Sequence, residues 1–555
     1  MRFLSNLFYR EQYIVLMMIF ILTAISVFAL NQYEYGLSDQ AITIPFLKSL
    51  ENPNLYPDDY LVSERSYYYS FFWQGLGFLG RYLPFNIPIL FFIFYCVSLF
   101  FFFWGIYLVA KILFQKQEVG YLSLFFLLFF KPLLGGISSF DRIFLTRVIV
   151  LPIIIFAFYF FLKKKFLWSF ILQGLGFLMH PLSAVHMIAI LFVASLIWIR
   201  KIGWKRMLIY WIILGILVSP IFVWKIISSP SSASLLHANI DWIQLLRLRS
   251  SDEIFPFSWP KIVLEEAALV FLVFLISLQY KPRGQYHRII IGAIFLILGF
   301  CVLATIFSEL IPIPLILNLQ LFRSFQWLFY FTCIYFANYF LRELQDSKKI
   351  NKLLLPLFVL GIFYGANNWI YGYVAFLFLM LLLVLGWRRT QFSSSHFIKI
   401  FLVVVLILGG IFYIKGDRFY LGNHQEPSWL DVAKRAKEET AEKDMFIVPP
   451  NLEGFRIESE RTIYGDWKDG TLMFYNPAFG KEWMRRMQRL GYQKDVPLKE
   501  SFLSLTESDF RVIAVEMRQS AGEGSRIFLV NFREGRRLNF PLVYGNAKFL
   551  VYEIE

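Results

Sequence analysis

A pair of carboxylates follows the first long apolar run of this sequence. They are Glu34 and Asp39, in the segment NQYEYGLSDQAITIPFLKSL. A carboxylate can act as a general base when it lies about 2.6–3.2 Å from the hydroxyl whose proton it takes. Burial beside lipid disfavours the charged form, so we expect a raised pKa for Asp39. Asp39 is therefore the candidate catalytic base, although Asp after Ser is also a good N-cap for a following helix.

Three other acids of the same loop could support Asp39. Glu34 could bind a metal ion together with Asp39, or it could be a solvated loop acid. Asp58 and Asp59 are adjacent in YPDDYL, a sequence typical of a turn. Adjacent side chains point in different directions, so this pair favours a turn, although one of the two could face the site. The cofactor is left open, with a divalent cation as the candidate.

Arginines suited to binding an anion occur near the ends of later apolar runs. Arg142 and Arg147 are in FDRIFLTRVIVLP, and Arg323 is alone in LNLQLFRSFQWL. Charges at membrane depth are costly and indicate function by default, and a guanidinium can bind two phosphate oxygens. The alternative is that these side chains snorkel to the interface. Asp141 could cap the helix after it or pair with one of the arginines.

His180 precedes Pro181 in GFLMHPLSAVHM, where one apolar run ends and the next begins. Its ring could donate to a phosphate or hold an acceptor. The alternative is a histidine whose hydrogen bonds are satisfied at a helix break. His186 follows six positions later, which is not the i, i+3 or i+4 spacing of a helical metal pair, so we predict no metal site there.

The elements that position these residues are predicted to be membrane spans. Of the 555 residues, 58% are hydrophobic, whereas soluble chains average roughly 45–50% and their cores stop growing at about 250–300 residues. The composition therefore predicts a polytopic, all-α membrane bundle of about thirteen spans. Apolar runs near the spanning length of ~20 residues occur at about 13–30, 87–110, 119–134, 147–162, 166–180, 182–199, 207–227, 261–279, 289–308, 325–341, 353–369, 371–387 and 398–414.

The basic residues predict the orientation of the bundle. With a cytoplasmic N-terminus, the inside segments hold about twice as many Lys and Arg as the outside loops, as the positive-inside rule requires. We therefore expect a multi-pass membrane protein with a cytoplasmic N-terminus and an extracytoplasmic C-terminal tail. The net charge of +15 lies in short clusters between apolar runs, so no nucleic-acid partner is expected. The three cysteines lie in or beside apolar runs, which argues against a disulfide framework or zinc site.

Two regions outside the spans look structured. The first outer loop, 31–86, contains AITIPFLKSL and YYYSFFWQGLGFLGRYL, which predict helices lying in the membrane interface. The tail, 415–555, predicts a small extracytoplasmic α/β domain. Its predicted helices are SWLDVAKRAKEETAEKD, with Ser428 as N-cap, and PAFGKEWMRRMQRLGY, ended by Gly491; its predicted strands are MFIVPP, RVIAVE, IFLVNF and KFLVYEIE.

Four charged residues of the tail could bind an acceptor or glycan, but a solvated strand face is the favoured interpretation. They lie in FRIESERTIYGDWK and are Arg456, Arg461, Asp466 and Lys468.

The whole plan resembles the GT-C superfamily of integral-membrane glycosyltransferases. The resemblance lies in the many spans, the long first outer loop with a carboxylate soon after span one, and the outer C-terminal domain. YGLSDQAITIPFLKSLENPNLYPDDYL and MFIVPPNLEGFRIESERTIYGDWKDG are also similar to an uncharacterised bacterial family of polytopic proteins. Many GT-C members carry an acidic pair in this loop, whereas here Asp39 is followed by Gln40.

The resemblance implies transfer of a sugar from a polyprenyl-phosphate donor to an acceptor glycan, lipid or protein at the extracytoplasmic face. Asp39 would then be the base, and Arg142, Arg147, His180 and Arg323 would bind the donor phosphate. The transmembrane domain would be 1–414 and the outer domain 415–555. The alternatives are a transporter or flippase of lipid-linked glycans, and a non-catalytic envelope assembly protein. A transporter is disfavoured because no two-fold repeat is evident and the charges gather at the outer ends of spans.

Overall fold

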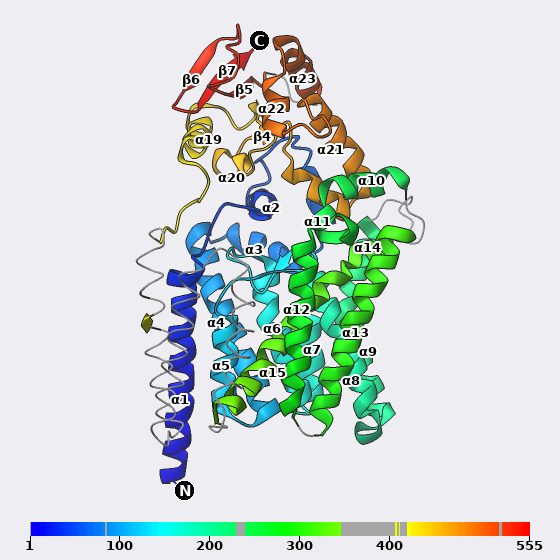
Figure 1. Cartoon of the computed structure of the whole chain (residues 1–555). Coiled ribbons are helices and arrows are strands. Elements are labelled where there is room, and N and C mark those ends of the chain that lie inside the picture. The colour runs from blue at the N-terminus through cyan, green and yellow to red at the C-terminus, as the bar shows by residue number, and fades with distance from the viewer. Residues whose placement is uncertain are drawn as a thin grey trace.

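The structure is a computed structural model with a long helical bundle below a small C-terminal domain (Figure 1). It describes residues 2–83, 86–228, 239–282, 284–345, 406–407, 410, 419–520 and 524–555. The predicted spans at 353–369, 371–387 and 398–414 lie outside the described residues.

The described bundle contains six helices that are long and apolar enough to cross a membrane, so the chain is a multi-pass membrane protein. These helices are α1 (Arg2–Ile25, continued by a π-helix at Ser26–Leu30), α4 (Ile87–Phe114), α8 (Pro181–Ile202), α9 (Trp204–Ser228), α12 (Lys261–Ser277) and α13 (Gln285–Thr305). Most carry apolar residues on every face, which is the pattern of helices buried in a large core or in lipid.

Four further helices complete the described part of the bundle. They are α5 (Gln117–Leu127), α6 (Thr146–Leu162), α7 (Phe166–Met179) and α15 (Phe325–Gln345). The predicted span at 119–134 is wrong in its extent, because α5 has only 11 residues. The chain then forms a hairpin of β1 (Pro132–Leu133) and β2 (Ile137–Ser138). The total of about thirteen spans therefore stays a prediction.

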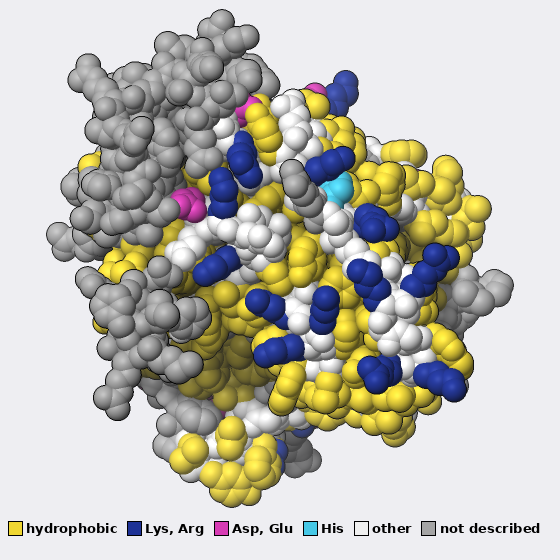
Figure 2. Space-filling model, turned by 90° about the horizontal axis from the view of Figure 1, so that it is seen from below, with side chains coloured by type: hydrophobic (Ala, Val, Ile, Leu, Met, Phe, Trp, Pro, Cys, Tyr) yellow, Lys and Arg dark blue, Asp and Glu magenta, His cyan; other side chains and the backbone are white. Residues whose placement is uncertain are grey.

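Within the described residues, the loops that were predicted to share the inner face lie together at one end of the bundle. The N-terminus lies at this end, opposite the C-terminal domain (Figure 1). Seen from below, the described side chains of this face include many Lys and Arg and few acids (Figure 2). Exposed examples next to the helix ends are Lys111, Lys163, Lys164, Lys165, Arg200, Lys201, Lys205, Arg206, Lys281 and Arg288.

The C-terminal domain is built on a five-stranded mixed sheet with the order β4-β3-β5-β7-β6. The strands are β3 (Met445–Ile447), β4 (Thr462–Ile463), β5 (Ile527–Phe532), β6 (Leu542–Gly545) and β7 (Phe549–Ile554). The helices are α19 (Pro427–Glu439), α20 (Phe455–Ser459), α21 (Pro477–Arg489), α22 (Leu498–Leu503) and α23 (Glu507–Ser520), with a 3₁₀ segment η7 (Lys468–Phe474). Strand β3 pairs in parallel with both β4 and β5, and β7 pairs antiparallel with both β5 and β6.

Two predictions of secondary structure in the tail are wrong. RVIAVE is part of helix α23, because its apolar residues Ile513 and Ala514 continue the helical stripe formed by Phe510 and Met517. The N-cap of α19 is Glu426, whose side chain accepts from the Trp429 N–H, so Ser428 is not the cap. The predicted strands at MFIVPP, IFLVNF and KFLVYEIE are confirmed, and Gly491 follows α21 in a left-handed conformation at φ +89°.

The first outer loop contributes to the core of the C-terminal domain. Helix α2 (Gln40–Glu51) contacts α3 (Phe71–Gly80) on one side and α20 and η7 on the other. Because nine of the residues of α2 are buried, the prediction that it lies in the membrane interface is wrong. Helix α3 does expose large apolar side chains, such as Phe71 and Phe78. The change in composition at 414/415 therefore does not coincide with the boundary between the hydrophobic core of the bundle and that of the C-terminal domain.

Residues from three segments that precede the C-terminal domain in the sequence enter the hydrophobic core of that domain. They are Tyr56, Tyr60 and Leu61 from the first loop, Trp242 and Leu246 from α10 (Ile240–Arg249), and Leu317 from α14 (Pro314–Leu319). The Trp242 indole N–H also donates to the Met473 carbonyl at 3.1 Å. The bundle and the C-terminal domain thus meet through packed, hydrogen-bonded elements.

Candidate functional site

Asp39 occupies the N-cap position of α2 but does not cap it through its side chain. Its Oδ1 lies 2.7 Å from Lys468 Nζ, and its Oδ2 accepts from the Arg147 guanidinium at 3.2 Å. The helix-cap interpretation therefore explains the backbone position and leaves the carboxylate free for ionic contacts. The three side chains come from α2, α6 and η7, so the site joins the bundle to the C-terminal domain.

The two cations set the protonation state of Asp39. Burial alone would raise its pKa, but the charges of Lys468 and Arg147 outweigh burial and hold this pKa well below its usual range. Arg323 lowers it further. The expectation of a raised pKa is therefore wrong, because sequence reasoning considered the lipid and not the cations. Asp39 is ionised, and a carboxylate of such low pKa is a weak base while both cations contact it.

Arg147 connects Asp39 with the interior of the bundle. It is the second residue of α6, and its Nε and second terminal nitrogen donate to the two carboxylate oxygens of Asp141 at 2.7 and 2.9 Å. This two-point contact is the planar geometry that guanidinium and carboxylate groups prefer. Asp141 pairs with an arginine rather than capping the helix, since the N-cap of α6 is Leu145.

A cavity lies beside Arg147, with about 650 Å³ of empty space including its open mouth. Arg147, Arg323 and Asp141 all line it. Its other polar side chains are Tyr95, Ser98, Ser138, Ser183, His186 and Gln326, and its apolar side chains include Leu99, Phe102, Leu151 and Trp327. The cavity is therefore lined by cations and hydrogen-bonding groups as well as by apolar side chains.

Arg323 is held in place in the lining of this cavity. It belongs to the 3₁₀ segment η6 (Leu321–Ser324), and it donates to Glu253 at 2.8 Å and to the Gly135 carbonyl at 3.2 Å. Its side chain is 14% exposed. These contacts fix the guanidinium inside the protein, so Arg323 does not snorkel to the interface.

His180 lies at the break between α7 and α8. Its Nδ1 accepts from the Ser183 N–H at 3.1 Å, which makes it the N-cap of α8 and leaves Nε2 as the protonated nitrogen of the neutral ring. Burial, together with the charges of Arg147 and Arg323, lowers the pKa of His180 to about 3. His180 is therefore a neutral hydrogen-bond donor within the electrostatic range of both arginines, and the helix-break interpretation also holds.

Arg142 and Glu34 are directed to each other. Their side chains form an ion pair at 2.7 Å, and Arg142 also donates to the Asn31 carbonyl at 2.5 Å. Neither residue lines the cavity. Arg142 thus lies outside the cavity that Arg147 and Arg323 line, and Glu34 pairs with Arg142 rather than acting with Asp39.

The donor set does not fit a metal ion at Asp39. Both Asp39 oxygens contact cations, and Glu34 contacts Arg142. Within the described ranges there is no group of three or more His, Cys, Asp or Glu that could hold a metal. We therefore derive no chemical step through a metal at this site.

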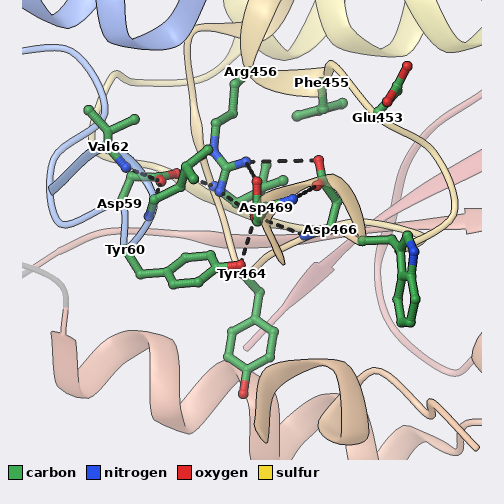
Figure 3. Close-up of polar contacts among 12 residues, drawn as sticks. Asp59, Tyr60, Val62, Glu453, Phe455, Arg456, Tyr464, Asp466 and Asp469 are labelled. Carbon is green, nitrogen blue, oxygen red and sulfur yellow. Dashed lines mark hydrogen bonds and ion pairs between the residues drawn. The ribbon is translucent and has the colours of Figure 1, made fainter. Parts of the chain in front are cut away.

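The pair Asp58 and Asp59 is split by the fold. Asp58 is exposed at a turn with φ +57°. Asp59 is buried and accepts from the Arg456 Nε at 2.7 Å. Arg456 also donates to Asp469 at 2.8 and 3.1 Å, and Asp466 lies 3.9 Å from it (Figure 3). We call these four residues, Asp59, Arg456, Asp466 and Asp469, the Arg456 cluster.

The solvated strand face predicted for the tail is wrong. Arg456, Arg461 and Asp466 are each less than 5% exposed, and the strand β4 has only two residues. Lys468 begins η7 and contacts Asp39. Its role could not be predicted, because its partner lies in the first outer loop and no local pattern relates the two.

Two aromatic side chains near Asp39 were also missed. Tyr68 and Tyr475 lie with ring centroids 5.2 Å apart, one from the first outer loop and one from the residue after η7. Burial and the charge of Asp39 raise the pKa of Tyr68 to about 12. The pKa of Tyr475 is also raised by burial, so both rings are neutral, and they pack against each other between the first outer loop and the C-terminal domain.

Comparison with known proteins finds a match to one short segment of the chain and weak structural similarity over most of its length. A domain of unknown function, DUF6798, matches residues 427–490, which contain Lys468 and three members of the Arg456 cluster. This match covers a small part of the chain and does not establish a family for it. No curated protein matches the sequence.

Three solved structures resemble the whole chain. ArnT from Cupriavidus metallidurans bound to undecaprenyl phosphate has 10% identity and a TM-score of 0.47, with 96% of each chain covered. ArnT in the apo state has 10% identity and a TM-score of 0.46, with 99% and 98% covered. The archaeal oligosaccharyltransferase AglB from Archaeoglobus fulgidus, in complex with an inhibitory peptide and a dolichol-phosphate, has 11% identity and a TM-score of 0.42, with 94% and 70% covered. Because these TM-scores lie below 0.5, the resemblance to GT-C proteins stays a prediction from the sequence.

Proposed function

We propose that this protein is a GT-C-type glycosyltransferase that moves a sugar from a polyprenyl-phosphate donor to an acceptor at the extracytoplasmic face. The observation that carries the proposal is the position of Arg147, between the Asp39 carboxylate and a cavity that Arg323 also lines. Arg147 and Arg323 would bind the donor phosphate, with His180 as a neutral donor near them. Arg142 is not part of this set, since it faces Glu34.

The proposed transfer needs one base and stabilisation of one leaving group. The acceptor hydroxyl oxygen forms a bond to the anomeric carbon, and its proton passes to the Asp39 carboxylate. The bond between the anomeric carbon and the phosphate oxygen breaks, and its electron pair leaves with the polyprenyl phosphate. Arg147 and Arg323 would stabilise the charge that develops on this oxygen, which is the kind of electrostatic stabilisation that fixed donors supply well.

The distribution of charge supports the proposed orientation. The end of the bundle that carries the N-terminus presents many Lys and Arg (Figure 2), and the positive-inside rule assigns such an end to the cytoplasm. The C-terminal domain and Asp39 would then lie outside, in the bacterial inner membrane. An acceptor glycan, lipid or protein would approach Asp39 from the junction of the first outer loop and the C-terminal domain, where Tyr68 and Tyr475 meet.

The test compares wild type, Asp39→Asn and Asp58→Asn, each purified in native lipid. Bound lipids are identified by mass spectrometry, and the loss of sugar from a retained polyprenyl-phosphate-sugar is followed over time. Wild type and Asp58→Asn should carry the lipid and consume it, because Asp58 is an exposed turn residue. Asp39→Asn should carry the lipid and consume it at a rate lower by roughly 10²–10⁴-fold, the usual loss on removing a general base.

Two results would contradict the proposal. If wild type neither carries nor consumes a lipid-linked sugar, the assembly-protein alternative gains support. If lipid-linked glycan crosses the bilayer of a reconstituted vesicle without losing its sugar, the protein is a transporter or flippase.

A further inference from the structure

We propose that Lys468 is an exchangeable cation that pairs with Asp39 in the free protein and moves to the donor phosphate when the donor binds, releasing Asp39 for the acceptor. This inference deepens the proposed function and rests on it. It assigns a substrate-binding role to the C-terminal domain, which supplies Lys468 through η7.

The first argument is the balance of charge around the site. The ion pairs are Lys468 with Asp39, Arg147 with Asp39 and Asp141, and Arg323 with Glu253. His180 is neutral, because burial and the two arginines lower its pKa to about 3. Among the described residues, three cations thus face three carboxylates at this site, and these pairs leave no positive charge over for a phosphate. A phosphate can gain a strong contact only if a cation leaves a carboxylate.

The second argument is that Lys468 is the cation best able to move. Arg147 is bound by Asp141 through two hydrogen bonds, and Arg323 is bound by Glu253 and a backbone carbonyl. In the described part of the chain, Asp39 is the one acidic group that contacts the Lys468 ammonium. Lysine also carries its charge on a flexible four-carbon stem with three rotatable donors, whereas the arginine fork is planar.

The third argument is that the backbone below Lys468 is fixed. Asp469 accepts from Arg456 and from the Tyr60 hydroxyl, and the Asp469 N–H donates to Asp466 at 3.0 Å. Figure 3 shows Asp466 and Asp469 turned toward the Arg456 guanidinium, with Asp59 on its other side. The Arg456 cluster therefore anchors η7 to the first outer loop, so the exchange needs only rotation of the Lys468 side chain.

The exchange has a chemical consequence for Asp39. The charge of Lys468 is the largest of the contributions that lower the pKa of Asp39. When Lys468 turns to the phosphate, Asp39 becomes a stronger base and one of its oxygens becomes free for the acceptor hydroxyl. Binding of the donor would thus prepare the base for proton transfer, and a site without a donor would keep the base masked.

The test measures the affinity of purified protein in nanodiscs for undecaprenyl phosphate, the chemical class of the released product. Lys468→Met should weaken binding by roughly ten- to a hundredfold, because a charge-assisted contact is lost. Lys468→Arg should keep most of the affinity. Asp39→Asn should tighten binding by roughly tenfold, because it releases Lys468 and removes a negative charge near the phosphate. Lys481→Met is the control, since Lys481 is an exposed lysine of the same domain paired with Asp241.

The opposite signs of the two substitutions make the test specific. A lysine that only links the two domains would give weaker binding or no change for both Asp39→Asn and Lys468→Met, and this result overturns the exchange. In the double variant Asp39→Asn/Lys468→Met, the change at Asp39 should raise the affinity for undecaprenyl phosphate by less than it does alone. The reason is that the Lys468 ammonium, which this change would release, is absent. If Lys468→Met does not fold, Asp39→Asn still decides, since an unchanged or weakened affinity contradicts the proposal. If wild type binds no undecaprenyl phosphate while folding normally, the proposed function itself fails.

Discussion

Two acid–cation sites of similar composition lie where the first outer loop meets the C-terminal domain. At the Asp39 site, the side chains of Asp39, Arg147 and Lys468 are 16–28% exposed, and the arginine reaches a cavity. In the Arg456 cluster, every side chain is at most 2% exposed. Both sites join the first outer loop to the C-terminal domain. The difference in access to solvent indicates that one site can exchange partners and the other holds the fold together.

The two sites also differ in the direction of their pKa shifts. Lys468 and Arg147 hold the pKa of Asp39 well below its usual range despite burial. Burial and the neighbouring charge of Asp469 raise the pKa of Asp466 well above its usual range, although Arg456 opposes them. One cation shared among three buried acids cannot neutralise all of them, so one acid keeps its proton. The direction of the pKa shift of a carboxyl group at these two sites thus depends on how many cations are present for each acid.

The largest effect on stability is expected for Arg456→Met. This change leaves buried carboxylates without their cation, and breaking a buried pair in this way costs about 3–5 kcal/mol of unfolding free energy. Thermal or denaturant unfolding of the purified protein measures it. Arg485→Met is the matched control, because Arg485 is 45% exposed on the same domain. Equal stability of the two variants would show that the Arg456 cluster does not hold the junction.

After Lys468→Met, the largest effect on ligand binding is expected for Arg323→Met. This arginine lines the cavity and is fixed there by Glu253, and loss of a charge-assisted contact to phosphate should weaken binding of undecaprenyl phosphate by about tenfold or more. Binding to protein in nanodiscs measures the change. An unchanged affinity, in a variant that folds, would remove Arg323 from the proposed phosphate site.

The pH dependence of stability should distinguish Asp466 from Asp39. Because the pKa of Asp466 is raised in the folded state, folded protein holds a proton that unfolded protein releases above pH ~4, so this group makes stability fall as pH rises. Asp466→Asn should remove that decline and change stability by about 1 kcal/mol or less near pH 4, since Asn resembles the protonated acid. Asp39 acts with the opposite sign, since its stabilising pair is lost only as pH falls below ~4. Unfolding curves between pH 4 and 8 provide the measurement, and a steeper decline in Asp466→Asn would contradict this assignment.

The smallest effect is expected for Arg142→Met. The pair of Arg142 with Glu34 is 36% and 27% exposed, and such pairs contribute about 0–1 kcal/mol. Turnover and the affinity for undecaprenyl phosphate should stay at wild-type levels, because Arg142 does not line the cavity. A loss of affinity like that of Arg323→Met would return Arg142 to the phosphate site.

Local patterns predicted the ends of elements and the residues found there. Asp39, Arg147 and Arg323 were singled out because charged residues next to apolar runs are unusual, and the fold brings them within electrostatic range of one another. The helices α4, α6 and α8 were predicted from apolar length. These features depend on neighbouring residues in the chain, so the sequence alone could reveal them.

Pairings between distant segments could not be predicted in this way. Asp59 looked like a turn residue, yet it binds Arg456 of the C-terminal domain. Lys468 looked like a solvated lysine, and it sets the pKa of Asp39. Both errors arise because the role of a charged residue depends on the residue that it contacts. These contacts form only where the two domains meet.

The most direct test of the account compares Asp39→Asn with Asp59→Asn in the same two measurements. Asp39→Asn should lose turnover of the polyprenyl-phosphate-sugar by roughly 10²–10⁴-fold, while its unfolding free energy falls by only about 0–1 kcal/mol, because its ion pairs are partly exposed. Asp59→Asn should lower the unfolding free energy by about 3–5 kcal/mol, because Asp59 accepts hydrogen bonds from Arg456 and from three backbone N–H groups; the fraction that remains folded should keep its turnover. If Asp59→Asn loses turnover while remaining stable, or Asp39→Asn unfolds, the division between an exchangeable site and a structural cluster is wrong.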